Sequence, residues 1–280
     1  MGNSLKFMKK LIVVADWAND SLCNQEFQSA TEGFLKKTLD CRISFVSSTP
    51  STIHTSYIIQ QIVSTEERLG KPRQTVLFGN TDPRVQTKTA TNKAQGADFV
   101  IVKLKSGMFL CGPNAGHSFS LIKNKISKIY LHKDLSKGSQ FRSRELYSKA
   151  SAQLVENRMS ELELIEASTD IVPDLKAMFI GHIDNYGNIK TTIKLSELRT
   201  KHSPGDHVNV EINGIKKTAN FVDNLFGGNL GDLVIYPGSS GDIDNPYVEI
   251  SIWRHFTEKD ISTGREVFGN PRPGNKITLS

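Results

Sequence analysis

The stretch Gly181-His-Ile-Asp-Asn-Tyr-Gly-Asn-Ile-Lys-Thr-Thr-Ile193 places a turn-forming segment between two short apolar runs. The runs, residues 177–180 and 189–193, are rich enough in β-branched and aromatic residues to form strands. The segment between them, 184–188, consists mostly of Asp, Asn and Gly, which favour tight turns. The stretch therefore predicts a β-hairpin with a carboxylate, an aromatic ring and a carboxamide at its bend.

The three side chains at this bend suit the recognition of a nucleoside. Asp184 can accept hydrogen bonds from two sugar hydroxyls, and the Asn188 amide can both donate to and accept from a purine edge. The Tyr186 ring can stack on a base. Asp, Asn and Gly are also the usual residues of an ordinary hairpin turn. The stretch alone leaves both interpretations open.

Short strand-like runs continue from this hairpin to the C-terminus. They span residues 177–183, 188–193, 206–213, 215–222, 232–236 and 247–253. Their connections include Asn213-Gly214, a strong hairpin signal, and the glycine-rich segment 226–231. This pattern predicts an all-β domain over residues 171–280, built as a small barrel or sandwich.

The chain before the hairpin alternates strands and helices. Leu11-Ile-Val-Val-Ala15 is a continuous apolar run, as expected of a strand buried on both faces. The predicted strands are 11–15, 42–47, 75–78, 96–102, 108–111 and 128–131, and the predicted helices are 21–39, 52–69 and 142–159. The β-α-β-α-β order at the start predicts a mostly parallel sheet with flanking helices. We expect an α/β domain over residues 1–170.

Polar residues follow three of the predicted parallel strands. Asp16 follows the first strand, the turn 47–50 follows the second, and Asp82 follows the third. Ligands of such sheets bind at the carboxyl ends of the strands, so these loops predict a site at one edge. The same aspartates could simply cap the segments after them. No Gly-x-Gly-x-x-Gly follows the first strand, which argues against a dinucleotide-binding loop.

The composition narrows the class of protein. The 280 residues are 38% apolar and 23% charged, typical of a soluble globular chain, and no apolar run has the ~20 residues of a membrane span. Cys23, Cys41 and Cys111 indicate reduced thiols in a cytoplasmic protein, and no Cys/His spacing suggests a metal site. The net charge of +6 comes from dispersed lysines, which favours a solvated basic surface over nucleic-acid binding.

Six motifs occur in the same order as in a known family. The segments are Ala15-Asp-Trp-Ala18, Thr81-Asp-Pro-Arg-Val-Gln86, Gly112-Pro-Asn-Ala-Gly116, Phe141-Arg-Ser-Arg-Glu145, the hairpin 184–193 and Gly238-Ser-Ser-Gly241. Together they resemble the S-adenosylmethionine (SAM) hydrolases, or SAM hydroxide adenosyltransferases, whose superfamily includes the fluorinase and chlorinase. The resemblance implies an α/β domain followed by a β-barrel domain, in a divergent member.

The resemblance also implies roles for individual residues. Asp16 would hold the ribose hydroxyls, Asn188 the adenine edge and Tyr186 a face of the base. Thr49, Asp184, Ser239 and Ser240 would complete the substrate-binding set. In the catalytic set, Asp82 matches the family's aspartate, Lys88 stands near its arginine, and Arg142 takes the place of its histidine. Histidine can accept a proton near neutral pH, whereas arginine effectively cannot.

The implied reaction is attack of water on C5′ of SAM, giving adenosine and methionine without a cofactor. The alternative is a non-catalytic SAM- or adenosine-binding protein that keeps the pocket without the family's Arg and His. A halide-using relative is disfavoured, because Arg84, Lys88 and Arg142 predict a wetter pocket than a halide requires. The resemblance further implies a homotrimer with sites between subunits, and we expect no nucleic-acid or membrane partner.

Overall fold

The computed structural model describes residues 8–36, 40–83, 96–132, 142–255, 257 and 261–280. The chain forms two compact units, Met1–Asp174 and Leu175–Ser280. In the described part of the chain, no helix is long and apolar enough to cross a membrane.

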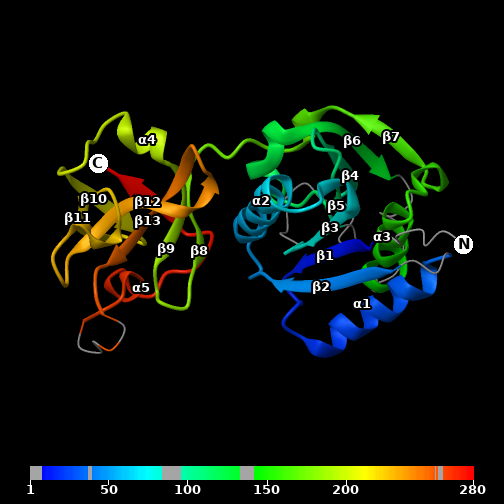
Figure 1. The fold of residues 1–280 in the computed structure, drawn as a ribbon, viewed down its shortest axis with the longest axis horizontal. Coiled ribbons are helices and arrows are strands. Elements are labelled where there is room, and N and C mark those ends of the chain that lie inside the picture. Colours follow the sequence, from blue (N-terminus) through cyan, green and yellow to red (C-terminus); the bar gives the residue numbers. More distant parts are fainter. Residues whose placement is uncertain (1–7, 37–39, 84–95, 133–141, 256, 258–260) are drawn as a thin grey trace, which may run out of the picture. The chain divides into compact units, whose positions relative to one another are not determined.

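The first unit is built on a seven-stranded sheet with the order β2-β1-β3-β5-β4-β6-β7 (Figure 1). Its strands are β1 (Lys9–Ala15), β2 (Cys41–Ser47), β3 (Thr75–Asn80), β4 (Phe99–Leu104), β5 (Phe109–Pro113), β6 (Ile126–His132) and β7 (Leu164–Ala167). The pairs β1–β2, β1–β3 and β3–β5 are parallel, whereas β4 is antiparallel to both β5 and β6. Parallel strands therefore form the part of the sheet that holds the loops after β1, β2 and β3.

Helices cover both faces of this sheet. The regular helices are α1 (Ser21–Phe34), α2 (Thr52–Arg68) and α3 (Ser148–Val155), with a π-helical turn η3 (Ser143–Tyr147) before α3 and a 3₁₀ segment η2 (Ser120–Lys125). The Asp20 side chain caps α1 by accepting from two backbone N–H groups, and the Ser51 side chain caps α2 by accepting from the backbone N–H of His54. Residues of α1 and α3 pack in one core layer, and residues of α2 and η2 pack in another.

The core of the first unit is aromatic on one face of the sheet. Phe27 of α1 stacks on Phe78 of β3, with ring centroids 5.1 Å apart. Trp17, which follows Asp16, packs against Phe27 and Phe45. The Trp17 ring thus belongs to the core.

The second unit is a closed barrel with the strand order β10-β11-β12-β13-β9-β8-β14. The strands are β8 (Met178–Ile183), β9 (Ile189–Lys194), β10 (His207–Ile212), β11 (Ile215–Phe221), β12 (Leu233–Asp242), β13 (Asn245–Ile252) and β14 (Lys276–Leu279). Short helices α4 (Leu195–Arg199) and α5 (Gly264–Val267) and the 3₁₀ turn η6 (Leu225–Gly227) connect them. The predicted fold class, an α/β unit followed by an all-β barrel, is confirmed.

Several predicted boundaries are wrong. Helix α1 ends at Phe34, before the predicted 39, because Leu35 adopts an extended backbone. The helix predicted over 142–159 is a π-helical turn followed by α3, and Asn157 with its φ of +58° lies beyond the end of α3. The sequence pattern also missed β7, β14, α4 and α5, which are all four or five residues long and too short for a clear period.

Candidate functional site

The loops after β1, β2 and β3 meet at one edge of the sheet. Ala15 is in register with Ser47 on one side and with Asn80 on the other. The backbone N–H of Asp16 donates to the carbonyl of Asn80 at 3.3 Å, and that of Ser48 donates to the carbonyl of Ala15 at 2.9 Å. The edge expected from the sequence is therefore present, with Asp16, Thr49 and Asp82 in its three loops.

Three buried hydroxyls connect the loops after β2 and β3 with helix α2. The Oγ1 of Thr55, in α2, lies 2.7 Å from that of Thr81 and 3.1 Å from the Oγ of Ser48. Ser48 and Thr81 complete the triangle at 3.1 Å, and all three side chains are buried. Because buried hydroxyls need partners, this closed set fixes the positions of the second and third loops relative to α2.

Asp16 and Asp82 lie close enough for their charges to interact. Burial raises the pKa of the Asp16 carboxyl above its usual 3.8, and the negative charge of Asp82 raises it further, against the lowering effect of two backbone N–H groups. Asp82 Oδ2 accepts from the backbone N–H of Ala97 at 3.1 Å. The edge thus concentrates two carboxylates in a half-buried setting.

Arg142 reaches the same place from the start of η3. A Cβ on Gly96 would lie 2.2 Å from Asp82 Oδ2 and 2.5 Å from Arg142 Nη2. The carboxylate and the guanidinium therefore both occupy the space beside this glycine. The Nη1 atom of Arg142 is buried and has no hydrogen-bond partner among the residues that the structure describes. This donor is available to a ligand that reaches it.

A hydrogen bond between Ser143, the residue after Arg142, and the end of β3 positions Arg142. The Asn80 amide at the end of β3 donates to Ser143 Oγ at 2.7 Å. Asp82, two residues after Asn80, and Arg142, next to Ser143, are thereby held near each other. Sequence reasoning missed Asn80, Ser143 and Gly96. Asn80 and Ser143 are close in sequence to Asp82 and Arg142, whereas Gly96 is distant from both and is brought to them by the fold.

Thr49 is oriented by a neighbouring ring. Its backbone N–H and its Oγ1 both lie 3.0 Å from Nδ1 of His54. Because the backbone N–H can only donate, Nδ1 accepts there. Lys88, the remaining catalytic candidate, lies outside the described residues, as does Arg84.

The hairpin β8–β9 is closed by Asp184. Its Oδ1 accepts from the backbone N–H groups of Tyr186 at 2.9 Å and Asn188 at 3.0 Å, and its Oδ2 accepts from the Asn188 amide at 3.0 Å. The side-chain amide oxygen of Asn188, Oδ1, in turn accepts from Ser251 Oγ in β13. Asp184 and Asn188 are thus held in place by the turn itself.

The bend exposes an aromatic ring. Tyr186 is 60% exposed. Gly187 has a φ of +80°, and a Cβ there would lie 2.6 Å from Thr263, which caps α5. Glycine is required at this position for both reasons.

A row of titratable side chains crosses four strands beside the hairpin. His182 of β8 is in register with Lys190 of β9, Lys190 with Glu249 of β13, and Glu249 with Tyr236 of β12. Lys190 Nζ lies 2.7 Å from Glu249 Oε1, and the Tyr236 hydroxyl donates to Oε2 at 3.2 Å. Burial lowers the pKa of His182, and the Lys190 charge adds to this shift, against the raising effect of Asp184 and Glu249.

Of the two predicted serines in the 238–241 segment, Ser239 contacts this row. Ser239 donates to Glu249 Oε1 through its backbone N–H at 2.9 Å and its hydroxyl at 3.1 Å, and it also accepts from Lys190 Nζ. Ser240 is buried. A Cβ on Gly238 would lie 2.4 Å from the Glu249 side chain, so the glycine allows this close approach. Sequence reasoning missed Lys190 and Glu249, because their pairing depends on strand register.

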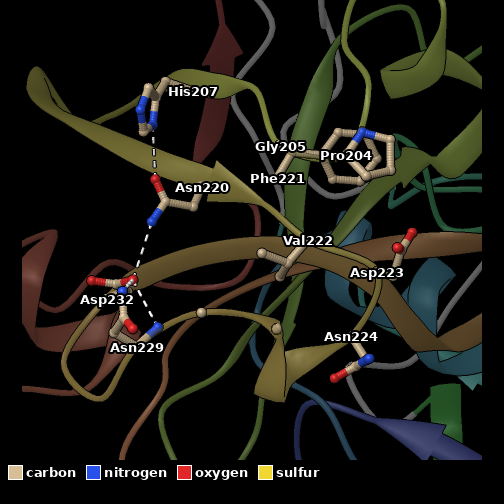
Figure 2. A pocket seen from close by; sticks show the side chains of 12 residues that line it. Pro204, Gly205, His207, Asn220, Phe221, Val222, Asp223, Asn224, Asn229 and Asp232 are labelled. Atoms are coloured by element: carbon tan, nitrogen blue, oxygen red, sulfur yellow. Dashed lines mark hydrogen bonds between the residues drawn. The ribbon is translucent and has the colours of Figure 1, made fainter.

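The barrel also has a polar cavity of about 530 Å³ next to β11 (Figure 2). His207, Asn220 and Asp232 form a chain of hydrogen bonds there, at 2.8 Å and 3.2 Å, and Asn229 also donates to Asp232. The lining includes none of the predicted site residues. Within the described ranges, no group of three or more His, Cys, Asp or Glu side chains is placed to hold a metal.

An α/β unit with polar groups at its parallel strand ends, followed by a seven-stranded barrel, defines the structural class. No family model matches the chain. The chain is 30% identical to the (R)-S-adenosyl-L-methionine hydrolase of Methanocaldococcus jannaschii over 125 residues, which make up 42% of this chain and 46% of that protein. The match thus spans about half the length of this relative, and over that part the chain is distantly similar to a SAM hydrolase.

Two solved structures have the same fold. An uncharacterized conserved protein from Thermotoga maritima aligns with a TM-score of 0.63 and 16% identity, over 96% of this chain and 99% of that one. A conserved hypothetical protein from Thermus thermophilus also aligns with a TM-score of 0.63 and 16% identity, over 98% and 100% of the two chains. At this identity the likeness concerns the fold alone.

Proposed function

We propose that the protein cleaves SAM with water at C5′, giving adenosine and L-methionine. The observation that supports this most directly is the arrangement of Asp82 and Arg142 around Gly96, with Asp16 close enough to Asp82 for their charges to interact. The distant similarity to a SAM hydrolase agrees with it.

The reaction needs orientation more than activation. The C5′–S bond of a sulfonium breaks to release neutral methionine, so the leaving group is already activated. The water oxygen forms the new bond to C5′, and its proton leaves to a base or to solvent. Asp82 is the proposed base, because one carboxylate oxygen is fixed by Ala97 N–H and the other can accept from water.

Arg142 would act as a donor. Its guanidinium keeps its charge near neutral pH, so it would orient the attacking water or pair with the methionine carboxylate through Nη1. Lys88 would take the place of the family's arginine. Asp16 would accept from the ribose hydroxyls, with Thr49 beside it.

The barrel residues would hold the nucleoside. Asn188, fixed by Asp184 and Ser251, would present its carboxamide to the adenine edge, and Tyr186 would contact a face of the base. Ser239 and Ser240 would border the same ligand. We further propose a homotrimer with sites between subunits; light scattering that gives a monomer would contradict this.

Incubation of the pure protein with SAM, followed by chromatography for adenosine, tests the proposal. Separate preparations enriched in the two sulfonium epimers would show whether the preference stated in the relative's name applies here. Loss of the base in Asp82→Asn should lower the rate by about 10²–10⁴-fold. Asp98→Asn, which removes an exposed carboxyl close in sequence to Gly96, should change the rate less than twofold.

One observation favours a second candidate, a protein that binds SAM or adenosine without cleaving it. Arg142 stands where the family has a proton acceptor, and an arginine cannot serve as one. Calorimetric binding of SAM with no adenosine formed over hours would favour this candidate and reject hydrolysis. If neither SAM nor adenosine binds, both candidates fail.

A further inference from the structure

The first unit has a cavity of about 530 Å³ that is lined by cations. Its polar and aromatic lining consists of Arg73, Lys103, Lys105, Phe109, Ser127 and Asn157. No carboxylate is among the residues that line it in the described part of the unit. Volumes of this size are typical of small-molecule sites.

The cavity and Asp16 lie at opposite ends of the strands of the sheet. Lys9, at the start of β1, donates to the carbonyl of Arg73 at 3.5 Å, whereas Asp16 follows the end of that strand. Because β4 runs antiparallel to β5, its last residues, including Lys103, reach the edge where β5 begins. A strand of this length separates the two edges by about 20 Å.

Two of the cations have no anionic partner among the described residues. Arg73 and Lys103 form none of the ion pairs found there. In the helix before Arg73, the carboxylates of Glu66 and Glu67 pair with Lys10 and Lys125, each at 2.8 Å. The described lining of the cavity therefore carries three cationic side chains and no carboxylate.

The register of β4 and β6 places two lysines opposite each other, so that their charges repel. Lys103 of β4 is directly opposite Lys128 of β6, and like charges at such positions are destabilising. Glu166 neutralises Lys128 at 3.0 Å, whereas the Lys103 ammonium has no ion-pair partner among the described residues and lies over the Phe109 ring, with 5.8 Å between Nζ and the ring centroid. A bound anion would relieve this repulsion.

Arg73 lies against the turn between β4 and β5. Gly107 in that turn has a φ of +86°, and a Cβ there would lie 3.2 Å from Arg73 Cγ and 3.4 Å from its Nε. The arginine stem thus passes over the glycine. A guanidinium held in this way can make paired hydrogen bonds to two phosphate oxygens.

We propose that this cavity binds a small molecule that bears a phosphate or diphosphate group. Arg73 and Lys103 contact the phosphate oxygens, with Lys105 at the rim, whereas the Ser127 hydroxyl already donates to the carbonyl of Lys103 at 2.9 Å. The Phe109 ring offers a surface for a base if the phosphate belongs to a nucleotide. This site is separate from the strand-end edge and does not depend on SAM cleavage.

Calorimetry at low ionic strength tests the proposal with three probes: inorganic pyrophosphate, cytidine 5′-diphosphate and cytidine. Cytidine avoids competition with an adenosine site. We expect pyrophosphate to bind and cytidine alone not to bind. A tenfold tighter binding of the nucleotide than of pyrophosphate would identify a nucleotide as the source of the phosphate.

Variants separate this site from general surface charge. The double variant Arg73→Gln and Lys103→Gln should weaken pyrophosphate binding at least tenfold, while Lys103→Arg should keep it within threefold. Lys71→Gln removes an exposed lysine, just before the 3₁₀ turn η1 (Pro72–Gln74), that does not line the cavity, and it should change binding less than twofold. Equal losses in the double variant and in Lys71→Gln, or no binding of pyrophosphate and of the nucleotide, would overturn the proposal.

Discussion

The strand-end edge of the α/β unit and the β8–β9 hairpin of the barrel both present carboxylates beside hydrogen-bond donors, but they use them differently. In the hairpin, Asp184 accepts three hydrogen bonds from its own turn, and Asn188 both donates and accepts. At the strand-end edge, the buried Nη1 of Arg142 has no partner among the described residues, and two carboxylates repel each other.

This difference separates a hairpin whose polar groups satisfy one another from an edge where, among the described residues, a buried donor is unpaired and two carboxylates repel each other. Groups that are satisfied in the protein hold their geometry and add stability. Groups that are buried and repel one another lower stability, and such arrangements are common where a ligand or a reaction is accommodated. Substitutions in the barrel row and hairpin should therefore lower stability, whereas those at the strand-end edge should mainly affect binding.

The largest expected effect is on the cross-strand row of the barrel. Glu249→Ala removes the acceptor for Lys190, Ser239 and Tyr236 and leaves a partly buried lysine without its carboxylate. Breaking one side of a buried pair costs about 3–5 kcal/mol of unfolding free energy. Urea unfolding monitored by circular dichroism measures this change.

A surface pair in the same barrel provides the control. Glu211 lies 3.5 Å from Lys216 with both side chains exposed, so Glu211→Ala should cost at most about 1 kcal/mol. Similar losses in the two variants would show that the row does not act as a buried network.

The next effect concerns the hairpin. Asp184→Ala leaves two backbone N–H groups and one amide without their acceptor, which should cost about 2 kcal/mol. Asn185→Ala, at the exposed neighbouring position, should change the unfolding free energy by no more than about 0.5 kcal/mol. An unchanged melting temperature in Asp184→Ala would mean that the turn holds without this carboxylate.

The sequence pattern predicted this hairpin and the strand-end edge for a simple reason. Turn residues between apolar runs and polar residues after buried strands depend only on local order along the chain. Asp16 and Asp82 come together because each follows a parallel strand of the same sheet. The resemblance to SAM hydrolases supplied their proposed roles.

The rest depends on register and on tertiary packing. Lys190 and Glu249 are 59 residues apart, and a shift of one residue in either strand would separate them. Gly96 matters because Asp82 and Arg142 converge on it from two other segments. The π-helical turn that precedes α3 also has no sequence period of its own, so 142–159 resembled one long helix.

A smaller effect is expected at Gly96. Gly96→Ala would place a methyl group against Asp82 and Arg142 and displace both side chains. Because small displacements of reacting groups reduce rates strongly, we expect at least a tenfold loss of adenosine formation or SAM binding with about 1 kcal/mol of destabilisation. Gly33→Ala has open space and should stabilise α1 slightly, by up to about 1 kcal/mol.

The smallest change in stability is expected for Asp16→Asn. Unlike the substitutions at the hairpin, the barrel row and Gly96, it should stabilise the fold. The folded protein raises the pKa of Asp16 above 3.8, so folding favours the protonated carboxyl. The stability linked to this group is full below pH 3.8 and is lost as the pH rises through the folded pKa. Asparagine does not titrate, so the variant does not lose this stability. Its unfolding free energy relative to the wild type should rise from about pH 4 upward, and it should be more stable at pH 7.

The same variant should bind SAM or adenosine more weakly, because an amide oxygen is a poorer acceptor for two ribose hydroxyls than a carboxylate. Melting temperatures at pH 3.5 and pH 7, together with calorimetry, measure both effects, with Asp98→Asn as the control for the loss of one charge. A variant that is less stable at pH 7 would show that Asp16 is satisfied like Asp184, and the contrast between the two regions would fail. Greater stability with weaker binding would instead identify Asp16 as a residue retained for the ligand at the expense of the fold.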